Sequence, residues 1–405
     1  MTNKLIIQIR QSKHLLTEAA LLLFLIGLIF PIKAAQSLGW AGIVLSSIIA
    51  LDKRPSIGSN WVWMAACALV LMAGAWGMQV APDPNMSWRA FWGYQTIGKG
   101  FLCAIALLTI PFSQNQIRRL LAFLLLMLIA RNLQMMIYGY QHPVFLGGSD
   151  YTNPIYLLSY RSQGDHILVL FPFILAAVFV WRKNINAALG LMVFEIALLA
   201  STGWRGAWLG FAGSCLLLLV LFRAWRILAG LVLGAISVGV IGLLASTDNI
   251  VALAINRGFG DSQRVELVWR PVIDMITLSG WQGYGFGQAR YLELIAAYAA
   301  AHPDKGIPVI GDAHNMVLNF AMAAGWIGAL AFIAVLISGI LLCLNRLRDK
   351  TLLPEQTILL AGTAAAWLGT YGLLGLTDQP HYNNLAVLAV LTSVALASSR
   401  KDNPR

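Results

Sequence analysis

Three separate segments of the chain carry side chains that could handle a phosphate group and a proton. Arg205 lies in the segment 201–208, Arg264 in 264–269, and His314 in 311–319. Guanidinium groups bind phosphate oxygens through paired hydrogen bonds, and an uncharged imidazole accepts a proton near neutral pH. These residue types fit a site that binds a phosphate group and accepts a proton.

The elements that must position the arginines are predicted helix starts. Arg205 directly precedes a helix predicted at 206–223, and Arg161 precedes one predicted at 166–181. The free backbone N–H groups and the dipole of a helix start favour an anion, so arginine at such a place predicts a phosphate site. The alternatives are an Arg205 side chain that extends to the membrane interface and an Arg161 side chain that pairs with Asp165.

His314 also lies at a predicted helix start, where Asp312 or Asn315 is available as the cap. The positive end of a helix dipole lowers the pKa of a nearby histidine and favours the neutral imidazole. A neutral imidazole at this position could accept a proton. The alternative is a histidine that only completes the capped helix start.

The composition indicates that these segments belong to a membrane protein. Of the 405 residues, 59% are hydrophobic and 11% are charged, and apolar runs recur from end to end. A soluble protein of this size cannot bury that much apolar surface, so lipid must surround most of the chain. The net charge of +11 comes from small basic groups between the runs, which argues against nucleic-acid binding.

We predict an all-α polytopic membrane protein in which residues 1–405 form one integral membrane domain. The short connections on the side of the N-terminus are rich in Lys and Arg, so both termini are predicted to be cytoplasmic. The longest outer loop, 247–325, lies between the ninth and tenth predicted helices and contains Arg264 and His314. The twelve predicted transmembrane helices are 15–31, 34–51, 61–78, 99–112, 118–138, 166–181, 186–201, 206–223, 227–246, 326–345, 356–374 and 383–398.

Neither a metal site nor a cofactor is predicted. The acidic residues of the predicted outer loops are scattered singly, and the sequence contains no Asp-x-Asp pair. The glycine-rich segment 280–287 lacks the strand-helix-strand context of a dinucleotide site. Asp378, in the last outer turn, is expected either to orient a reactive group or to pair with an arginine.

These motifs together resemble the bacterial O-antigen ligase and polymerase superfamily. The resemblance rests on the segment 205–208 at a helix start, on Arg264 through Trp269 before a glycine-rich turn, and on His314 followed after ten residues by Gly325. The last spacing is similar to the ligase branch. Val268 stands where the family pattern Arg-x3-Leu has leucine.

The resemblance implies a GT-C-like glycosyltransferase in the bacterial inner membrane with a periplasmic active site. It would move an O-antigen glycan from undecaprenyl diphosphate to the lipid A-core oligosaccharide by metal-independent, inverting single displacement. His314, Arg264 and Arg205 would be catalytic. The diphosphate and glycan would contact Arg205, Arg264, Arg161, Asn315 and Asp378.

Other functions remain open from the sequence. Within the superfamily they are an O-antigen polymerase and a protein O-oligosaccharyltransferase. From a different class, an anion transporter would also use several spans with basic outer vestibules, although it would favour discontinuous helices and internal pseudo-symmetry.

Overall fold

The computed structural model describes residues 2–50, 60–141, 160–182, 184–201, 204–233, 237 and 264–399. All regular secondary structure in these ranges is helical. The elements of the first half are α1 (Thr2–Ile29), α2 (Lys33–Ala50), α3 (Trp61–Val80), α4 (Pro84–Trp88), the π-helical turn η2 (Arg89–Tyr94), α5 (Ile97–Leu107), α6 (Gln114–Gln141), α7 (Tyr160–Ala177), the π-helical turn η4 (Val178–Arg182), α8 (Ile185–Ser201) and α9 (Arg205–Leu221).

The second half contains α15, the longest helix of the described chain, and the elements packed around its beginning. Its elements are the π-helical turn η5 (Val265–Trp269), α13 (Arg270–Leu278), α14 (Gln288–Ala301), the 3-10 turn η6 (Pro303–Lys305), α15 (Met316–Arg346), α16 (Pro354–Trp367), the π-helical turn η7 (Leu368–Leu374), α17 (Gly375–Thr377) and α18 (Tyr382–Ser398).

The helices account for the apolar runs of the sequence. Eleven of the predicted segments overlap a helix of the structure, and within 227–246 the described residues 227–233 and 237 are helical while the others lie outside the described residues. In the described chain, five helical runs are long and apolar enough to cross a membrane, and five more apolar helices are shorter. The prediction of an all-helical polytopic membrane protein is therefore confirmed.

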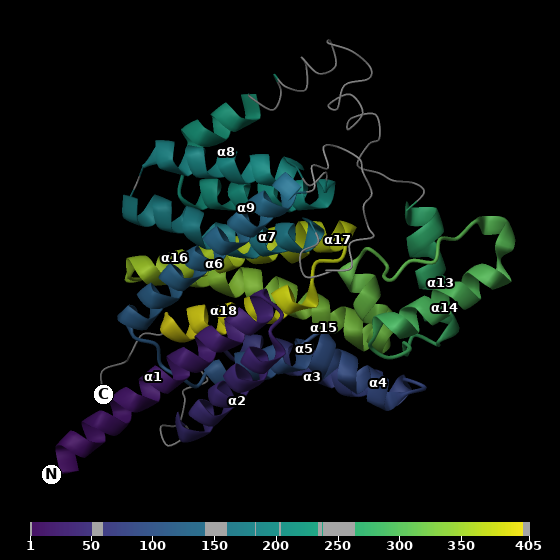
Figure 1. Cartoon of the computed structure of the whole chain (residues 1–405), viewed down its shortest axis with the longest axis horizontal. Coiled ribbons are helices and arrows are strands. Elements are labelled where there is room, and N and C mark those ends of the chain that lie inside the picture. The colour runs from purple at the N-terminus through teal and green to yellow at the C-terminus, as the bar shows by residue number, and fades with distance from the viewer. Residues whose placement is uncertain are drawn as a thin grey trace.

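The long helices lie side by side, and the outer elements project from one end of them. Figure 1 shows α13 and α14 beyond the end of the bundle at which α17 lies. The beginning of α1 and the far end of α18 lie at the opposite end. α13, α14 and α17 thus lie at one end of the bundle, and the beginning of α1 and the end of α18 lie at the other.

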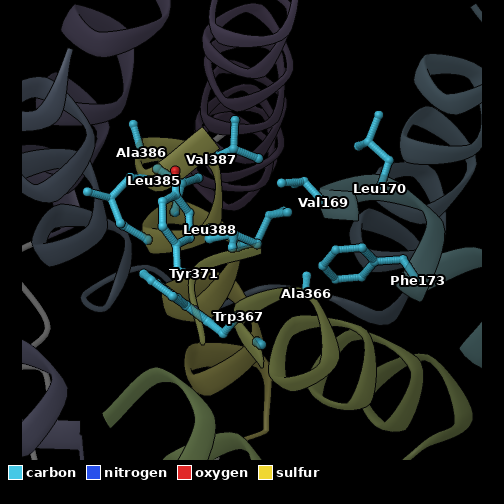
Figure 2. Close-up of a cluster of buried hydrophobic side chains, with 14 of the residues drawn as sticks. Val169, Leu170, Phe173, Ala366, Trp367, Tyr371, Leu385, Ala386, Val387 and Leu388 are labelled. Carbon is cyan, nitrogen blue, oxygen red and sulfur yellow. The ribbon is translucent and has the colours of Figure 1, made fainter. Parts of the chain in front are cut away.

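The core of the bundle forms where α7, α16, η7 and α18 meet. Figure 2 shows Phe173 of α7, Trp367 of α16 and Tyr371 of η7 together with Leu385 to Leu388 of α18. All of these side chains are buried. A second, smaller cluster joins α13 and α14 to the beginning of α15 through residues such as Val272, Ile295 and Met322. This second cluster fixes the outer elements to the spanning helices.

α15 begins ten residues earlier than the helix predicted at 326–345, and it is kinked. Ala324 and Gly325 interrupt the helical backbone, with φ −137° and ψ 23° at Ala324 and φ 61° and ψ −150° at Gly325. The conformation at Gly325 is essentially restricted to glycine. The helical arm from Met316 to the kink therefore extends outward from the spanning part, and His314 lies directly before its first turn.

Candidate functional site

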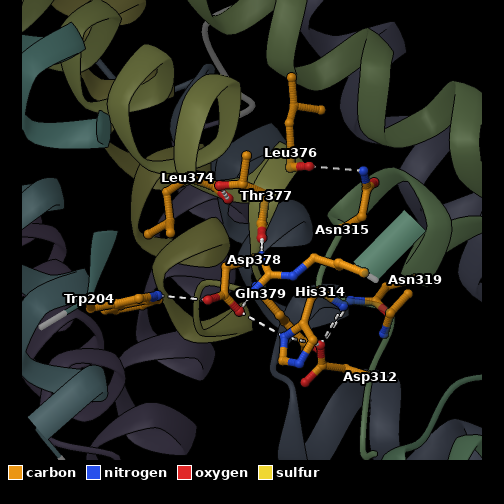
Figure 3. A network of polar contacts seen from close by, with 12 residues as sticks. Trp204, Asp312, His314, Asn315, Asn319, Leu374, Leu376, Thr377, Asp378 and Gln379 are labelled. Carbon is orange, nitrogen blue, oxygen red and sulfur yellow. Dashed lines mark hydrogen bonds and ion pairs between the residues drawn. The ribbon is translucent and has the colours of Figure 1, made fainter. Parts of the chain in front are cut away.

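His314 and Asp378 meet at the outer end of the bundle, although they come from different helix connections. The Nδ1 atom of His314 lies 2.9 Å from the Oδ1 atom of Asp378 (Figure 3). His314 precedes α15, and Asp378 follows α17. An Nδ1–H group that donates to a carboxylate leaves Nε2 as the proton acceptor of the neutral ring. The pair therefore has the geometry of a histidine base oriented by a carboxylate.

Trp204 fixes the second oxygen of the same carboxylate. Its indole Nε1 donates to the Oδ2 atom of Asp378 at 2.6 Å, and both side chains are buried, with 6% and 7% of their residue surface exposed (Figure 3). The backbone N–H of Gln379 also donates to Asp378 Oδ1, at 2.9 Å. A buried carboxylate stays ionised when such donors satisfy it. Sequence analysis did not identify Trp204 as a site residue, because its partner lies 174 positions away.

The carboxylates reverse the expected electrostatics of the histidine. Burial alone lowers the pKa of His314, but the hydrogen bond with Asp378 and the negative charges of Asp312 and Asp378 outweigh burial and the nearby Arg264, so that this pKa lies above its ordinary value. The expectation that the helix dipole would lower the pKa was wrong. Burial alone would raise the pKa of Asp378, yet the hydrogen bond and charge of His314, with help from Trp204 and the Gln379 backbone, lower it to about 2.

Asp312 supports the histidine from within its own loop. Its Oδ1 atom accepts the backbone N–H of His314 at 2.6 Å and lies 3.2 Å from His314 Nδ1. His314 has a left-handed backbone with φ 47°, which non-glycine residues rarely adopt. The Asp312 carboxylate thus holds His314 in this conformation and adds a second negative charge beside the ring.

Asn315 is the N-cap of α15, as one of the two sequence alternatives predicted. Its side-chain oxygen accepts the backbone N–H of Leu318 at 3.1 Å, and its Nδ2 donates to the carbonyl of Leu376 at 3.0 Å (Figure 3). One amide therefore caps the helix and ties it to α17. Because His314 and Asp378 stand next to these two anchor points, Asn315 helps to set their separation.

Two further amide side chains, those of Asn319 and Gln379, belong to this hydrogen-bond network and were not identified from the sequence. Asn319 Oδ1 accepts the backbone N–H of Ala313 at 2.9 Å, and Asn319 Nδ2 lies 3.0 Å from Gln379 Oε1. These contacts link the loop that holds His314 to the turn that holds Asp378.

The spacing between His314 and Gly325 follows from the kink of α15. The glycine-rich segment packs directly on it: Gly285 N–H donates to Ala323 O at 2.8 Å, and Trp326 N–H donates to Trp281 O at 3.2 Å. A Cβ atom at Gly325 would lie 2.0 Å from Trp281 O. The glycine therefore permits a close backbone contact that fixes one end of the helical arm, while His314 lies at the other end.

Arg264 is the predicted arginine that the structure places in the same group. Its Nη1 atom donates to the carbonyl of Thr377, the residue before Asp378. Its positive charge also lowers the pKa of His314, although less than the carboxylates raise it. A guanidinium carries five N–H donors, and the contact with Thr377 uses one of its nitrogens. Arg264 can therefore hold the turn and bind an anion at once.

Arg205 and Arg161 lie in helical turns beside this group, with side chains outside the described part of the structure. Arg205 is the first residue of α9, directly after Trp204. Arg161 lies in the first turn of α7, where a Cβ at Gly164 would come within 3.5 Å of the Trp204 ring. The backbones of both arginines thus lie near the tryptophan that contacts Asp378.

The other outer arginines contact acidic neighbours on the surface. Arg270 pairs with Glu266, and Arg290 pairs with Glu293. Arg257 lies outside the described residues. Among the predicted outer arginines whose side chains are described, Arg264 is thus the one near His314. The assembled group combines a polarised histidine, an ionised carboxylate and a guanidinium, a set that can take a proton from a weak acid and stabilise a departing anion.

One known family matches part of the chain. Among curated proteins, none matches the chain in sequence. Residues 187–333 match the family described as O-antigen ligase. This segment contains Arg205, Arg264, His314 and Gly325, the residues on which the predicted resemblance rests. The predicted resemblance is therefore confirmed over this segment: residues 187–333 of this polytopic membrane protein are similar to the O-antigen ligase family.

Proposed function

We propose that the protein is a glycosyltransferase that moves an O-antigen glycan from undecaprenyl diphosphate to the lipid A-core oligosaccharide. The observation that carries the proposal is the 2.9 Å contact between His314 and Asp378, beside Arg264, in a chain whose residues 187–333 are similar to the O-antigen ligase family. A sugar hydroxyl is too weakly acidic to attack unaided, and a diphosphate leaves more readily beside positive charge. The group supports both requirements.

The proposed reaction is a single displacement. As the acceptor oxygen attacks the anomeric carbon of the donor glycan, its proton passes to Nε2 of His314. The bond from that carbon to the diphosphate oxygen breaks, and the diphosphate leaves with the electron pair. Attack on the face opposite to the leaving group inverts the anomeric configuration. Asp378 remains ionised and stabilises the imidazolium that forms, as expected for a carboxylate with a low pKa.

The proposed donor site consists of Arg264 with Arg205 and Arg161. Arg264 is held by Thr377 beside the reactive pair, and the helix starts of α9 and α7 bring the backbones of the other two arginines near Trp204. Guanidinium groups neutralise the charge that develops on the diphosphate, so the proposed chemistry uses no metal ion or other cofactor. We assign Asn315 and Asp378 to the glycan side of the site, where they act by positioning His314.

The proposed membrane arrangement is a GT-C-like fold of about twelve spans in the bacterial inner membrane, with 247–325 as its large periplasmic loop. Both termini would be cytoplasmic and the site would face the periplasm. The position of the beginning of α1 and the end of α18 supports this arrangement, because they lie at the end of the bundle away from α13 and α17 (Figure 1). The enrichment of Lys and Arg near the termini also supports it.

The test is transfer of a lipid-linked glycan by the detergent-purified full-length protein, with lipid A-core oligosaccharide as the acceptor. We expect a glycan-extended lipid A-core product. His314→Gln should lower turnover by about 10²- to 10⁴-fold, the range typical of a lost general base. Binding of the carrier should persist, because the base acts in the transition state. His302→Gln, in the outer segment after α14, is the matched control and should retain activity.

The same assay separates the competing functions. Growth of the glycan on its own carrier, without use of the lipid A-core, would indicate a polymerase. Transfer to a peptide would indicate a protein O-oligosaccharyltransferase. Anion uptake into proteoliposomes, without transfer to any acceptor, would indicate a transporter. Full turnover of His314→Gln would contradict the role of His314 in any of the transferase functions.

A further inference from the structure

The connection between α17 and α18 is short, and it must place Asp378 between two partners. Only residues 378–381 separate Thr377 from Tyr382, and they include Pro380, whose φ angle is fixed by its ring. Asp378 contacts Trp204 with one oxygen and His314 with the other. A shift of this turn by about 1 Å would change a catalytic geometry enough to cost about 100-fold in rate.

Buried side chains hold both backbone groups of His381, at the far end of this turn. The Oδ2 atom of Asp165, on α7, accepts the His381 N–H at 2.9 Å. The hydroxyl of Tyr371, on η7, donates to the His381 carbonyl at 2.8 Å. Asp165 is 1% exposed and Tyr371 is fully buried. Hydrogen bonds to a buried carboxylate are among the stronger ones, so these contacts fix the backbone position of His381.

The near end of the turn is fixed independently. The Asp378 N–H donates to Leu374 O at 2.8 Å, and the Gln379 N–H donates to the Asp378 side chain. The turn is therefore held at Asp378 by α17 and at His381 by α7 and η7. Burial and the charge of Arg131 lower the pKa of the His381 ring to about 4, so this ring is uncharged near neutral pH. The Asp165 contact described here is made to the backbone N–H of His381.

We propose that Asp165 and Tyr371 are positioning residues that hold the 378–381 turn in the place where Asp378 meets His314. The expected effect on turnover rests on the proposed transferase function. The expected effect on the His314 pKa does not, because it depends only on the distance between Asp378 and the His314 ring. We call the hydrogen bonds of Asp165 and Tyr371 to the His381 backbone the clamp. If the clamp is removed, Asp378 moves away from the His314 ring, and its hydrogen bond and charge raise the His314 pKa less. The other charged groups that face His314, namely Asp312 from its own loop and Arg264 from the start of η5, stay in place.

The test measures the titration of His314 without any substrate. Full-length protein reacts with diethyl pyrocarbonate across a pH series, and mass spectrometry resolves modification of the peptide with His314 from that with His302. Because the reagent attacks neutral imidazole, the midpoint reports the His314 pKa. We expect Asp165→Ala and Tyr371→Phe to move this midpoint to lower pH and to leave that of His302 unchanged. Asp165→Asn retains an oxygen acceptor for the His381 N–H and should keep the parental midpoint.

Glu355→Ala is the matched control for the loss of a buried acid. Glu355 lies in the first turn of α16 and is 2% exposed, and its carboxylate contacts Arg118 and Gln114. It is at the opposite end of the helical run Pro354–Thr377 from the 378–381 turn. Glu355→Ala should therefore leave the midpoint of the His314 titration unchanged. A parental midpoint in both Asp165→Ala and Tyr371→Phe would overturn the proposal, as would a shift in Glu355→Ala equal to theirs. If the Asp165 variants do not fold, Tyr371→Phe, which keeps the ring, decides alone.

Turnover gives the second readout. If the protein is the proposed transferase, Asp165→Ala should lower kcat about 10-fold or more with little change in the KM for the carrier, because it displaces a catalytic pair without removing a binding group. Asp165→Asn should restore kcat. Equal loss in both variants would overturn the positioning role. A parent protein without transferase activity would refute the proposed function, and the His314 titration would still test the clamp.

Discussion

The imidazole of His314 and the carboxylate of Asp378 lie 2.9 Å apart, although 64 residues separate them in the chain. This contact joins the outer ends of two long helical runs, α15 and the run from α16 to α17. It also makes the protonation state of the histidine depend on a residue of another segment. The chemistry of the site therefore depends on how α15, α17 and α9 are held together at one end of the bundle.

The role of Arg264 predicts that lysine cannot replace it. Arg264→Lys and Arg264→Ala should both weaken carrier binding and lower turnover, because a single ammonium cannot hold Thr377 O and a diphosphate together as a planar guanidinium does. Loss of a charged hydrogen bond to the leaving group should cost at least about 10-fold in kcat/KM. Transfer assays and carrier-binding measurements on both variants provide the check.

Arg270→Ala is the matched control for these arginine variants. Arg270 lies six residues further along the same segment, and its exposed side chain pairs with Glu266. Exposed pairs contribute little, so this variant should behave like the parent. Parental activity in Arg264→Lys, or an equal loss in Arg270→Ala, would show that Arg264 contributes only positive charge to the outer surface. Arg205→Lys should resemble Arg264→Lys.

Chelation should not affect the proposed transfer. Within the described residues, no group of three or more His, Cys, Asp or Glu side chains is arranged to hold a metal ion. In the proposed reaction, Arg264, which contacts Thr377 beside Asp378, supplies the charge for the leaving group. Activity should therefore survive excess EDTA and gain nothing from added magnesium or manganese. Loss on chelation that one of these ions reverses would direct attention to Glu266, Asp312 and Asp378 as ligands.

Gly325 should be intolerant of any side chain. Gly325→Ala would place a Cβ atom 2.0 Å from Trp281 O at a backbone with φ 61°, so both steric overlap and backbone strain destabilise the variant. Gly306 is the matched control, because its φ of 59° is similar but a Cβ atom there would meet open space. Gly306→Ala should lose only about 1–2 kcal/mol of stability from the left-handed backbone. Thermal unfolding in detergent should show a clearly larger fall in Tm for Gly325→Ala than for Gly306→Ala.

The helices and the beginning of α15 could be predicted because they depend on local sequence. Apolar runs define spanning helices by length alone, and Asn315 was identified as a possible cap from its place before an apolar segment. The kink was not predicted, since the spanning helix was predicted to begin only at residue 326, after Ala324 and Gly325. The backbone of α15 on both sides of the kink is hydrogen-bonded to the segment 281–285, which is distant in the sequence.

The partners of His314 could not be predicted from the sequence for a related reason. A helix start by itself lowers a histidine pKa, and this local rule gave the wrong sign. The actual direction depends on Asp378, which the packing of α17 against α15 brings to the ring, and on Trp204, which the start of α9 supplies. The sequence motifs identified His314 and Asp378 as candidates, whereas only the tertiary structure could show that the Asp378 carboxylate orients the His314 ring.

The pH dependence of transfer by the parent protein and Asp378→Asn tests the account most directly. In the parent, turnover should fall as pH drops through the raised pKa of His314, because the base must be neutral to accept a proton. Asp378→Asn removes the negative charge and favours the wrong ring tautomer, so kcat should fall by at least about 10-fold and the acidic limb should move to lower pH. A parental rate with an unmoved acidic limb in Asp378→Asn would contradict the account.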